Sequence, residues 1–112
     1  MLSYENLDVY KVAIQFFAFC INLIRRTPPG NGDVLDQLKR ASLSILNNIA
    51  EGTGKTTLTD KRKYFSIARG SAMECGATLD ALFILKLCDD KTLETGKALL
   101  IRVVSMLSRM CR

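Results

Sequence analysis

The hydrophobic residues of this chain recur every three to four positions, the spacing of one face of an α-helix. A first pattern begins at Asn6 or Asp8 and runs to about Arg26, before Pro28-Pro29-Gly30, which cannot continue a helix. A second pattern begins at Asp33, a residue type that caps helix N-termini, and ends at Gly52-Thr53-Gly54. The first half of the chain therefore predicts two helices.

The second half of the chain predicts two more helices. Thr57, followed three residues later by Asp60, resembles a capping box and starts a helix that continues to about Leu87. The segment Asp89–Thr92 supplies a turn and a cap before a fourth helix, from about Leu93 to the C-terminus. With short connections and no strand pattern, we predict an all-α, antiparallel up-down-up-down four-helix bundle, a single domain over residues 1–112.

The second and third helices carry polar side chains at the edge of their apolar faces. At about 100° per residue, several polar positions of the second helix fall into one stripe. They are Gln37, Arg40, Ser44, Asn48 and Glu51. In the third helix, polar Ser71, Glu74 and Thr78 project with four positions expected in the core, Tyr64, Ile67, Leu82 and Leu85.

Buried charges must pair, because an unpaired buried carboxylate is strongly destabilising. We therefore predict a structural polar network in which Arg40 pairs with Glu74, joined by Gln37, Ser44, Asn48, Glu51 and Ser71. In this interpretation the network sets the register of the second and third helices, and Glu74→Ala destabilises the protein by several kcal/mol, as when a buried pair is broken. Two alternatives remain: a ligand or catalytic pocket lined by Arg40, Asn48, Glu51 and Glu74, or a subunit interface.

Two glycines interrupt the third helix. Gly70 and Gly76 are each unfavourable there by about 1 kcal/mol relative to alanine. We expect them to permit close approach by the backbone of a neighbouring helix.

The composition argues against metal binding and against most hydrolytic chemistry. The chain has no histidine, and its four cysteines, Cys20, Cys75, Cys88 and Cys111, form no C-x-x-C pair, so we expect reduced, mostly core-filling thiols and no metal or cofactor. Without histidine there is no Ser-His or Cys-His triad, and we assign no catalytic residue. The stretch Gly52–Thr57 resembles the tail of a P-loop, but Ile49 stands where the motif needs a glycine.

The chain shows no membrane span or signal peptide, so we expect a cytoplasmic protein without a membrane partner. The longest apolar run is Phe16–Ile21, far too short to cross a bilayer. The net charge of +5 favours anionic partners, or only solubility. The candidate phosphate contacts are Arg25, Arg26, Lys55, Lys61, Arg62, Lys63 and Arg69.

Two spaced blocks resemble a known family. The run Gln37-x-x-Arg40-Ala41-x-x-Ser44-Ile45-x-x-Asn48-Ile49-Ala50-Glu51-Gly52 is similar to the signature of the 23S rRNA intervening-sequence proteins, also called four-helix-bundle proteins. The block Phe65-x-Ile67-Ala68-x-Gly70-Ser71-x-x-Glu74 matches the third helix of that family, and Leu7–Ala13 resembles its usual start.

The resemblance implies a left-handed four-helix bundle without enzymatic activity. Members are similar to the accessory protein of diversity-generating retroelements, a pentamer that binds nucleic acid beside a reverse transcriptase. By that analogy we expect a ribosomal-protein-like homopentamer that binds RNA, or a nucleic-acid-processing protein, through a basic surface. The alternative is a protein–protein scaffold with no nucleic-acid role, supported by the broad apolar face of the first helix.

Overall fold

Four α-helices account for most of the molecule in the computed structural model, which describes residues 1–112. They are α1 (Asp8–Arg26), α2 (Gly32–Gly54), α3 (Leu58–Ile84) and α4 (Asp90–Met110). A short 3-10 turn, η1 (Ser3–Asn6), precedes α1, and there is no strand.

Two of the predicted helix caps are present. The Thr57 hydroxyl accepts a hydrogen bond from the Asp60 amide at 3.2 Å, and the Asp89 carboxylate accepts one from the Thr92 amide at 2.8 Å. Each satisfies an amide that lacks an intrahelical partner. The predicted cap at Asp33 is wrong, because Asn31 is the N-cap and Asp33 lies within the first turn of α2. A carboxylate there still interacts favourably with the helix dipole.

α3 ends at Ile84, before the predicted Leu87. The chain reverses at Lys86, whose φ of 62° lies in the left-handed region, and the Leu87 amide donates to the Leu82 carbonyl at 2.9 Å. This six-residue closure satisfies a terminal carbonyl in the manner of a Schellman motif. A lysine occupies the position where glycine is usual, so no glycine signal marked the end of the helix.

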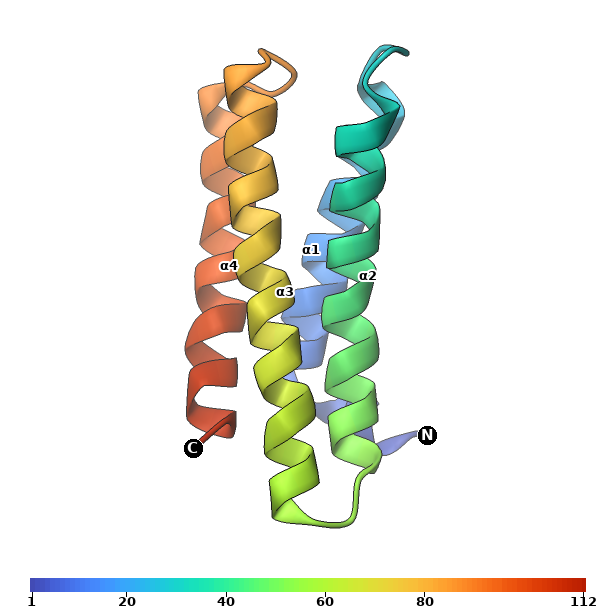
Figure 1. Ribbon diagram of the computed structural model, residues 1–112, viewed down its shortest axis with the longest axis vertical. Helices are drawn as coiled ribbons and strands as arrows, with labels where there is room; N and C mark the ends of the chain where they lie inside the picture. The colour runs from blue at the N-terminus through green and yellow to red at the C-terminus, as the bar shows by residue number, and fades with distance from the viewer.

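The helices form an up-down-up-down bundle, as Figure 1 shows. The bundle measures 44 × 22 × 21 Å, and each helix packs against two neighbours, α1 and α3 both contacting α2 and α4. The antiparallel order places the α2–α3 turn and the two chain ends at one end of the bundle. The α1–α2 and α3–α4 turns lie at the other.

The core lies along the bundle axis and contains side chains from all four helices. Its fully buried members include Phe16, Leu38, Ile45, Leu79 and Val103. Leu82 is buried as predicted, and Tyr64 is half-buried. The prediction was wrong for Ile67 and Leu85, which are 42% and 53% exposed. Ile67 lies on the solvent side of α3, and Leu85 lies past the last helical residue as the C-cap.

The glycines that permit close helix packing are not the two expected. A Cβ at Gly70 would meet nothing within 4 Å, and one at Gly76 would make an ordinary contact with Leu100 at 3.8 Å. A Cβ at Gly52, by contrast, would lie 2.7 Å from the Phe65 ring and 3.2 Å from the Lys61 carbonyl. At Gly96 it would lie 2.8 Å from Leu79. Close approach therefore occurs at Gly52 and Gly96.

Candidate nucleic-acid interface

The polar contact between α2 and α3 is small and uncharged. The Ser44 and Ser71 hydroxyls lie 2.8 Å apart across the two helices, and the Asn48 amide donates to the Ser44 hydroxyl at 3.0 Å and to the Ser44 carbonyl at 2.8 Å. All three side chains are partly buried, and no buried polar side-chain atom lacks a partner. Ser44, Asn48 and Ser71 thus join the two helices without a buried charge.

The charged part of the predicted network is absent. Gln37, Arg40, Glu51 and Glu74 are exposed, and neither of the two ion pairs joins Arg40 to Glu74. Glu51 pairs instead with Lys55, one helical turn along, at 3.7 Å. The helical projection gave the right stripe, but the stripe lies at the outer margin of the α2–α3 contact, where water solvates the charges.

The cysteine side chains pack inside the core or against it, as predicted. Cys20 and Cys75 are buried, while Cys88 and Cys111 are half-buried, and all four are free. Burial raises the pKa of the Cys20 thiol far above its usual range. Burial, and to a lesser extent the Glu74 carboxylate, raises the pKa of Cys75 to about 12. Both therefore stay neutral thiols at physiological pH, a state without nucleophilic or metal-ligating character.

No group of three or more histidine, cysteine or acidic side chains is placed to hold a metal ion. None of the four helices combines the length and apolar character required to span a bilayer.

The candidate phosphate contacts divide between the two ends of the bundle. Lys55, Lys61, Arg62 and Lys63 lie at and just after the α2–α3 turn, and Arg69 lies in the first half of α3. Arg25 and Arg26 close α1 at the opposite end of a bundle 44 Å long. The structure therefore separates this pair from the other candidates, and the seven residues do not form one face.

Several of these cations have intramolecular partners. The Lys61 ammonium donates to the Thr53 carbonyl at 2.9 Å, and the Arg69 guanidinium donates to the Ser108 hydroxyl on α4 at 2.8 Å. The ammonium groups of Lys55 and Lys63 lie 5.0 and 5.6 Å from the centre of the Tyr64 ring. These contacts hold basic side chains at the surface around the turn.

The fold adds basic residues that the sequence did not single out. Because the helices alternate in direction, the first half of α1 and the second half of α4 lie at the same end as the α2–α3 turn. This places Lys11, Arg102 and Arg109 with the turn. The predicted antiparallel topology already implied that these cations lie near the turn. They were missed because each is isolated in the sequence and belongs to no basic cluster.

The whole net charge of +5 is carried by this end of the bundle, called the basic end below. Divided at the helix midpoints, the basic end holds nine cationic side chains: Lys11, Lys55, Lys61, Arg62, Lys63, Arg69, Arg102, Arg109 and Arg112. Its acidic residues are Glu5, Asp8, Glu51 and Asp60. At the other end, Arg25, Arg26, Lys39, Arg40, Lys86, Lys91 and Lys97 are balanced by Asp33, Asp36, Glu74, Asp80, Asp89, Asp90 and Glu94.

These features define an all-α four-helix-bundle protein with one strongly basic end. The chain belongs to the 23S rRNA-intervening sequence protein family, whose model matches residues 5–109. The resemblance found in the two sequence blocks is thereby confirmed.

A solved structure supports the same fold. The crystal structure of a protein of unknown function from the S23 ribosomal protein family of Bacteroides thetaiotaomicron VPI-5482 is similar, with a TM-score of 0.82. The match covers 93% of this chain and 98% of that one. At 18% sequence identity, the likeness concerns the fold alone. No curated protein matches the chain.

Proposed function

We propose that this protein is a non-enzymatic, homo-oligomeric module that binds RNA, or a ribonucleoprotein, through the basic end of its bundle. The observation that carries the proposal is the confinement of the net charge of +5 to that end. A concentrated positive field attracts polyanions more strongly than the same charge spread over the whole surface.

Lys55, Lys61, Arg62, Lys63 and Arg69 are the proposed phosphate contacts around the α2–α3 turn. Arg62 and Lys63 are exposed and make no ion pair, so both are free to meet a phosphate. Lys55 forms an ion pair with the exposed carboxylate of Glu51. Such a surface ion pair is weak enough to be exchanged for a phosphate.

The apolar surface between α3 and α4 supports self-association. A groove of about 600 Å³ there is lined mainly by small and apolar side chains, among which Met73 and Ile101 are 51% and 68% exposed. The others are Ala72, Gly76, Ala77, Leu100 and Val104. Asp80 and Lys97, which pair with each other, and Ser105 complete the lining. The solvent side of α3 is rich in small and apolar side chains, and Glu74 and Asp80 are its only charged residues between Ser66 and Ala81. The others are Ser66, Ile67, Gly70, Met73, Ala77 and Ala81. Small residues allow a second helix to approach closely, so we assign this groove to another copy of the chain. The pentamer itself rests on the resemblance to the retroelement accessory protein.

Fluorescence anisotropy of a labelled structured RNA, titrated at two salt concentrations, tests the RNA-binding proposal. Tight binding that falls steeply with salt is expected from counterion release. Reversing Lys61, Arg62 and Lys63 to glutamate should abolish it. Reversing Lys39, Arg40 and Lys91, which changes the net charge equally at the other end, should leave most of it.

A protein–protein scaffold is the second candidate, in which the α3–α4 groove holds a different protein instead of another copy of the chain. Absence of RNA binding at low salt would reject the first proposal and leave this one. Equal losses from the two triple variants would show an unspecific charge effect and would also contradict an RNA site at the basic end.

A further inference from the structure

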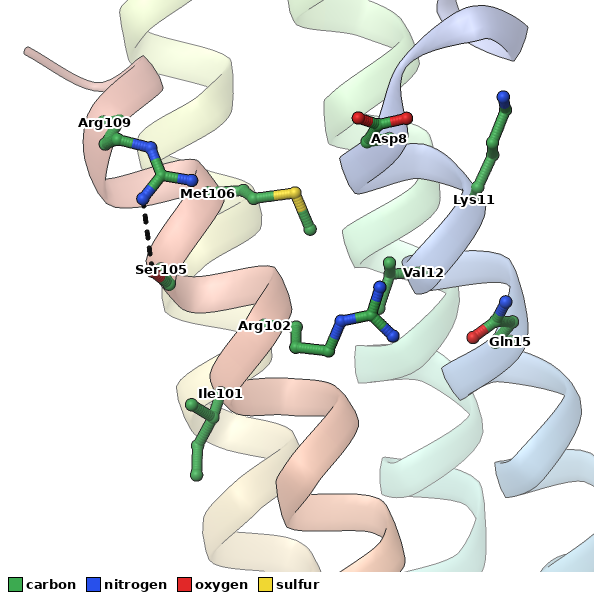
Figure 2. Close-up of a pocket in the computed structure, with 9 residues that line it drawn as sticks. All are labelled: Asp8, Lys11, Val12, Gln15, Ile101, Arg102, Ser105, Met106 and Arg109. Atoms are coloured by element: carbon green, nitrogen blue, oxygen red, sulfur yellow. Dashed lines mark hydrogen bonds between the residues drawn. The ribbon is translucent and has the colours of Figure 1, made fainter.

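A groove between the first half of α1 and the second half of α4 lies within the basic end, outside the residues around the α2–α3 turn. It has a volume of about 530 Å³ and opens to solvent. Figure 2 shows its lining side chains, which come from α1 and α4 alone. They are Asp8, Lys11, Val12, Gln15, Ile101, Arg102, Ser105, Met106 and Arg109.

The charged side chains that line this groove are mostly basic. The lining holds three cations, Lys11, Arg102 and Arg109, against one carboxylate, that of Asp8, and none of the three cations belongs to an ion pair. Arg102 projects from α4 across the groove toward α1, while Arg109 turns back along α4 and donates to the Ser105 hydroxyl at 3.4 Å. Two unpaired guanidinium groups on one helix face are well suited to bidentate binding of phosphate oxygens.

The same groove has an apolar component. Val12 is 3% exposed at the α1 side, and the Met106 side chain extends from α4 toward α1. Ile101, 68% exposed, continues this surface along α4. A mixed lining of guanidinium, hydroxyl, amide and apolar groups matches a nucleotide, whose phosphate is anionic and whose base presents flat apolar faces.

The groove lies at the same end of the bundle as the cations of the first half of α3. Arg69 of α3 reaches across to the Ser108 hydroxyl on α4 at 2.8 Å, and Arg109, the next residue, belongs to the groove. Cationic side chains therefore follow one another from α3 over α4 to α1. A polynucleotide backbone crossing the end of the bundle in this direction would meet positive charge at each helix.

We propose that the α1–α4 groove binds a single-stranded segment of RNA, with Arg102 and Arg109 contacting consecutive phosphates and Met106 contacting the base. This inference rests on the proposed RNA-binding function and identifies a second, previously unmarked part of that site. Ser105 and Gln15 supply neutral donors or acceptors for the ribose and base edge.

The test is anisotropy of a labelled oligouridylate with wild-type protein and with an Arg102→Gln/Arg109→Gln variant. On a single strand each phosphate contact contributes a salt exponent of about 0.7, so two lost contacts should weaken binding roughly 25-fold near 0.1 M salt. The plot of log Kd against log salt should also become shallower, by about 1.4. Arg102→Lys/Arg109→Lys, which keeps the charge, should retain most of the affinity.

A matched control removes two arginines from the opposite end. Arg25→Gln/Arg26→Gln makes the same change in net charge and should alter Kd by less than about twofold. All four arginines changed in these variants are exposed, and circular dichroism should show unchanged helix content in each variant. Met106→Ala adds a test of the base contact and should weaken oligouridylate binding without changing the salt slope.

The outcomes separate this inference from the proposed function. If the wild-type protein binds neither oligouridylate nor structured RNA at low salt, the proposed function fails and the groove site fails with it. If the wild type binds but the Arg102→Gln/Arg109→Gln variant binds equally well, while reversal at Lys61, Arg62 and Lys63 abolishes binding, the groove inference alone is overturned.

Discussion

Ser44 and Ser71 show what polar side chains do at a helix–helix contact in this protein. Their hydroxyls meet at 2.8 Å, and Asn48 completes the hydrogen bonding from one turn away on α2. A contact of neutral groups satisfies its donors and acceptors without the large desolvation penalty of a buried ion pair. Register between α2 and α3 is thus specified by short, uncharged side chains.

Double-mutant cycles distinguish the contact that exists from the one that the helical projection suggested. Arg40→Ala and Glu74→Ala, singly and together, should each change the free energy of unfolding by less than about 0.5 kcal/mol and show no coupling. Ser44→Ala and Ser71→Ala should couple by about 1 kcal/mol. Urea denaturation measures both cycles, and a coupling above about 1 kcal/mol between Arg40 and Glu74 would contradict the exposed placement.

Because its thiols are buried, the protein should lose stability as the pH rises into the alkaline range. The pKa of Cys75 is raised from its ordinary value of 9.0 to about 12, so the unfolded chain loses this proton first as pH rises. Stability from this group is full below about pH 9 and declines above it, by up to about 1.4 kcal/mol per pH unit. Thermal melts between neutral pH and about pH 10 should show a shallower decline for Cys75→Ala than for wild type. If Tm fell equally steeply with pH in both proteins, the prediction would be wrong, even where the cavity left by Cys75→Ala lowers Tm at every pH.

At the scale of the element, α3 has large apolar side chains on its solvent side as well as on its inner side. Its inner side fills the core through Phe65, Ala68 and Leu79. Its solvent side exposes Ile67 and Met73 beside charged residues such as Glu74 and Asp80. Gly70 lies on that outer side with no neighbour within 4 Å. Large apolar side chains exposed together mark interaction surfaces, which supports the assignment of this part of the outer side to subunit contact.

The end of α3 offers a prediction about a single element. Lys86 adopts a φ of 62°, which costs a residue with a Cβ about 1 kcal/mol relative to glycine. Lys86→Gly should therefore raise the free energy of unfolding by about that amount. Lys63→Gly, an exposed lysine inside α3, should lower it by about 1 kcal/mol, measured in the same urea titrations. Destabilisation by Lys86→Gly would show that the lysine side chain has a structural role at this turn.

At the scale of the whole molecule, the antiparallel order of the helices produces the charge separation. Cations that are far apart along the chain, such as Lys11, Lys61 and Arg109, meet at one end because alternate helices run in opposite directions. The same order leaves two candidate surfaces, the basic end and the α3–α4 groove, which adjoin at Ile101 and Ser105 of α4.

The α3–α4 groove gives a prediction about assembly. Ile101→Lys introduces a charge into this apolar surface at a position that is 68% exposed, so the fold should survive while association is lost. Light scattering with size-exclusion chromatography should show a multimer for wild type and a monomer for the variant. Ile84→Lys, at a residue 76% exposed but outside the groove, should keep the wild-type mass. Monomeric wild-type protein would contradict the oligomer.

The amino-acid sequence by itself determined the helices, their order and the family. Periodicity, the caps at Thr57 and Asp89 and the breaker at Pro28-Pro29 are local signals, because a helix forms and ends through contacts within a few residues. Two spaced blocks of residues were enough to indicate the 23S rRNA-intervening sequence proteins, and the family model confirms them.

Only the tertiary structure decided which side chains are buried, paired or brought together. A helical projection places Arg40, Ser44 and Glu74 near an apolar face, but the distance to the facing helix decides that the serine is enclosed and the charges are solvated. The roles of Gly52 and Gly96 likewise depend on Phe65 and Leu79, which belong to other helices. Arg102 and Arg109 joined the basic end for the same reason, because proximity between helices is a property of packing and not of local sequence.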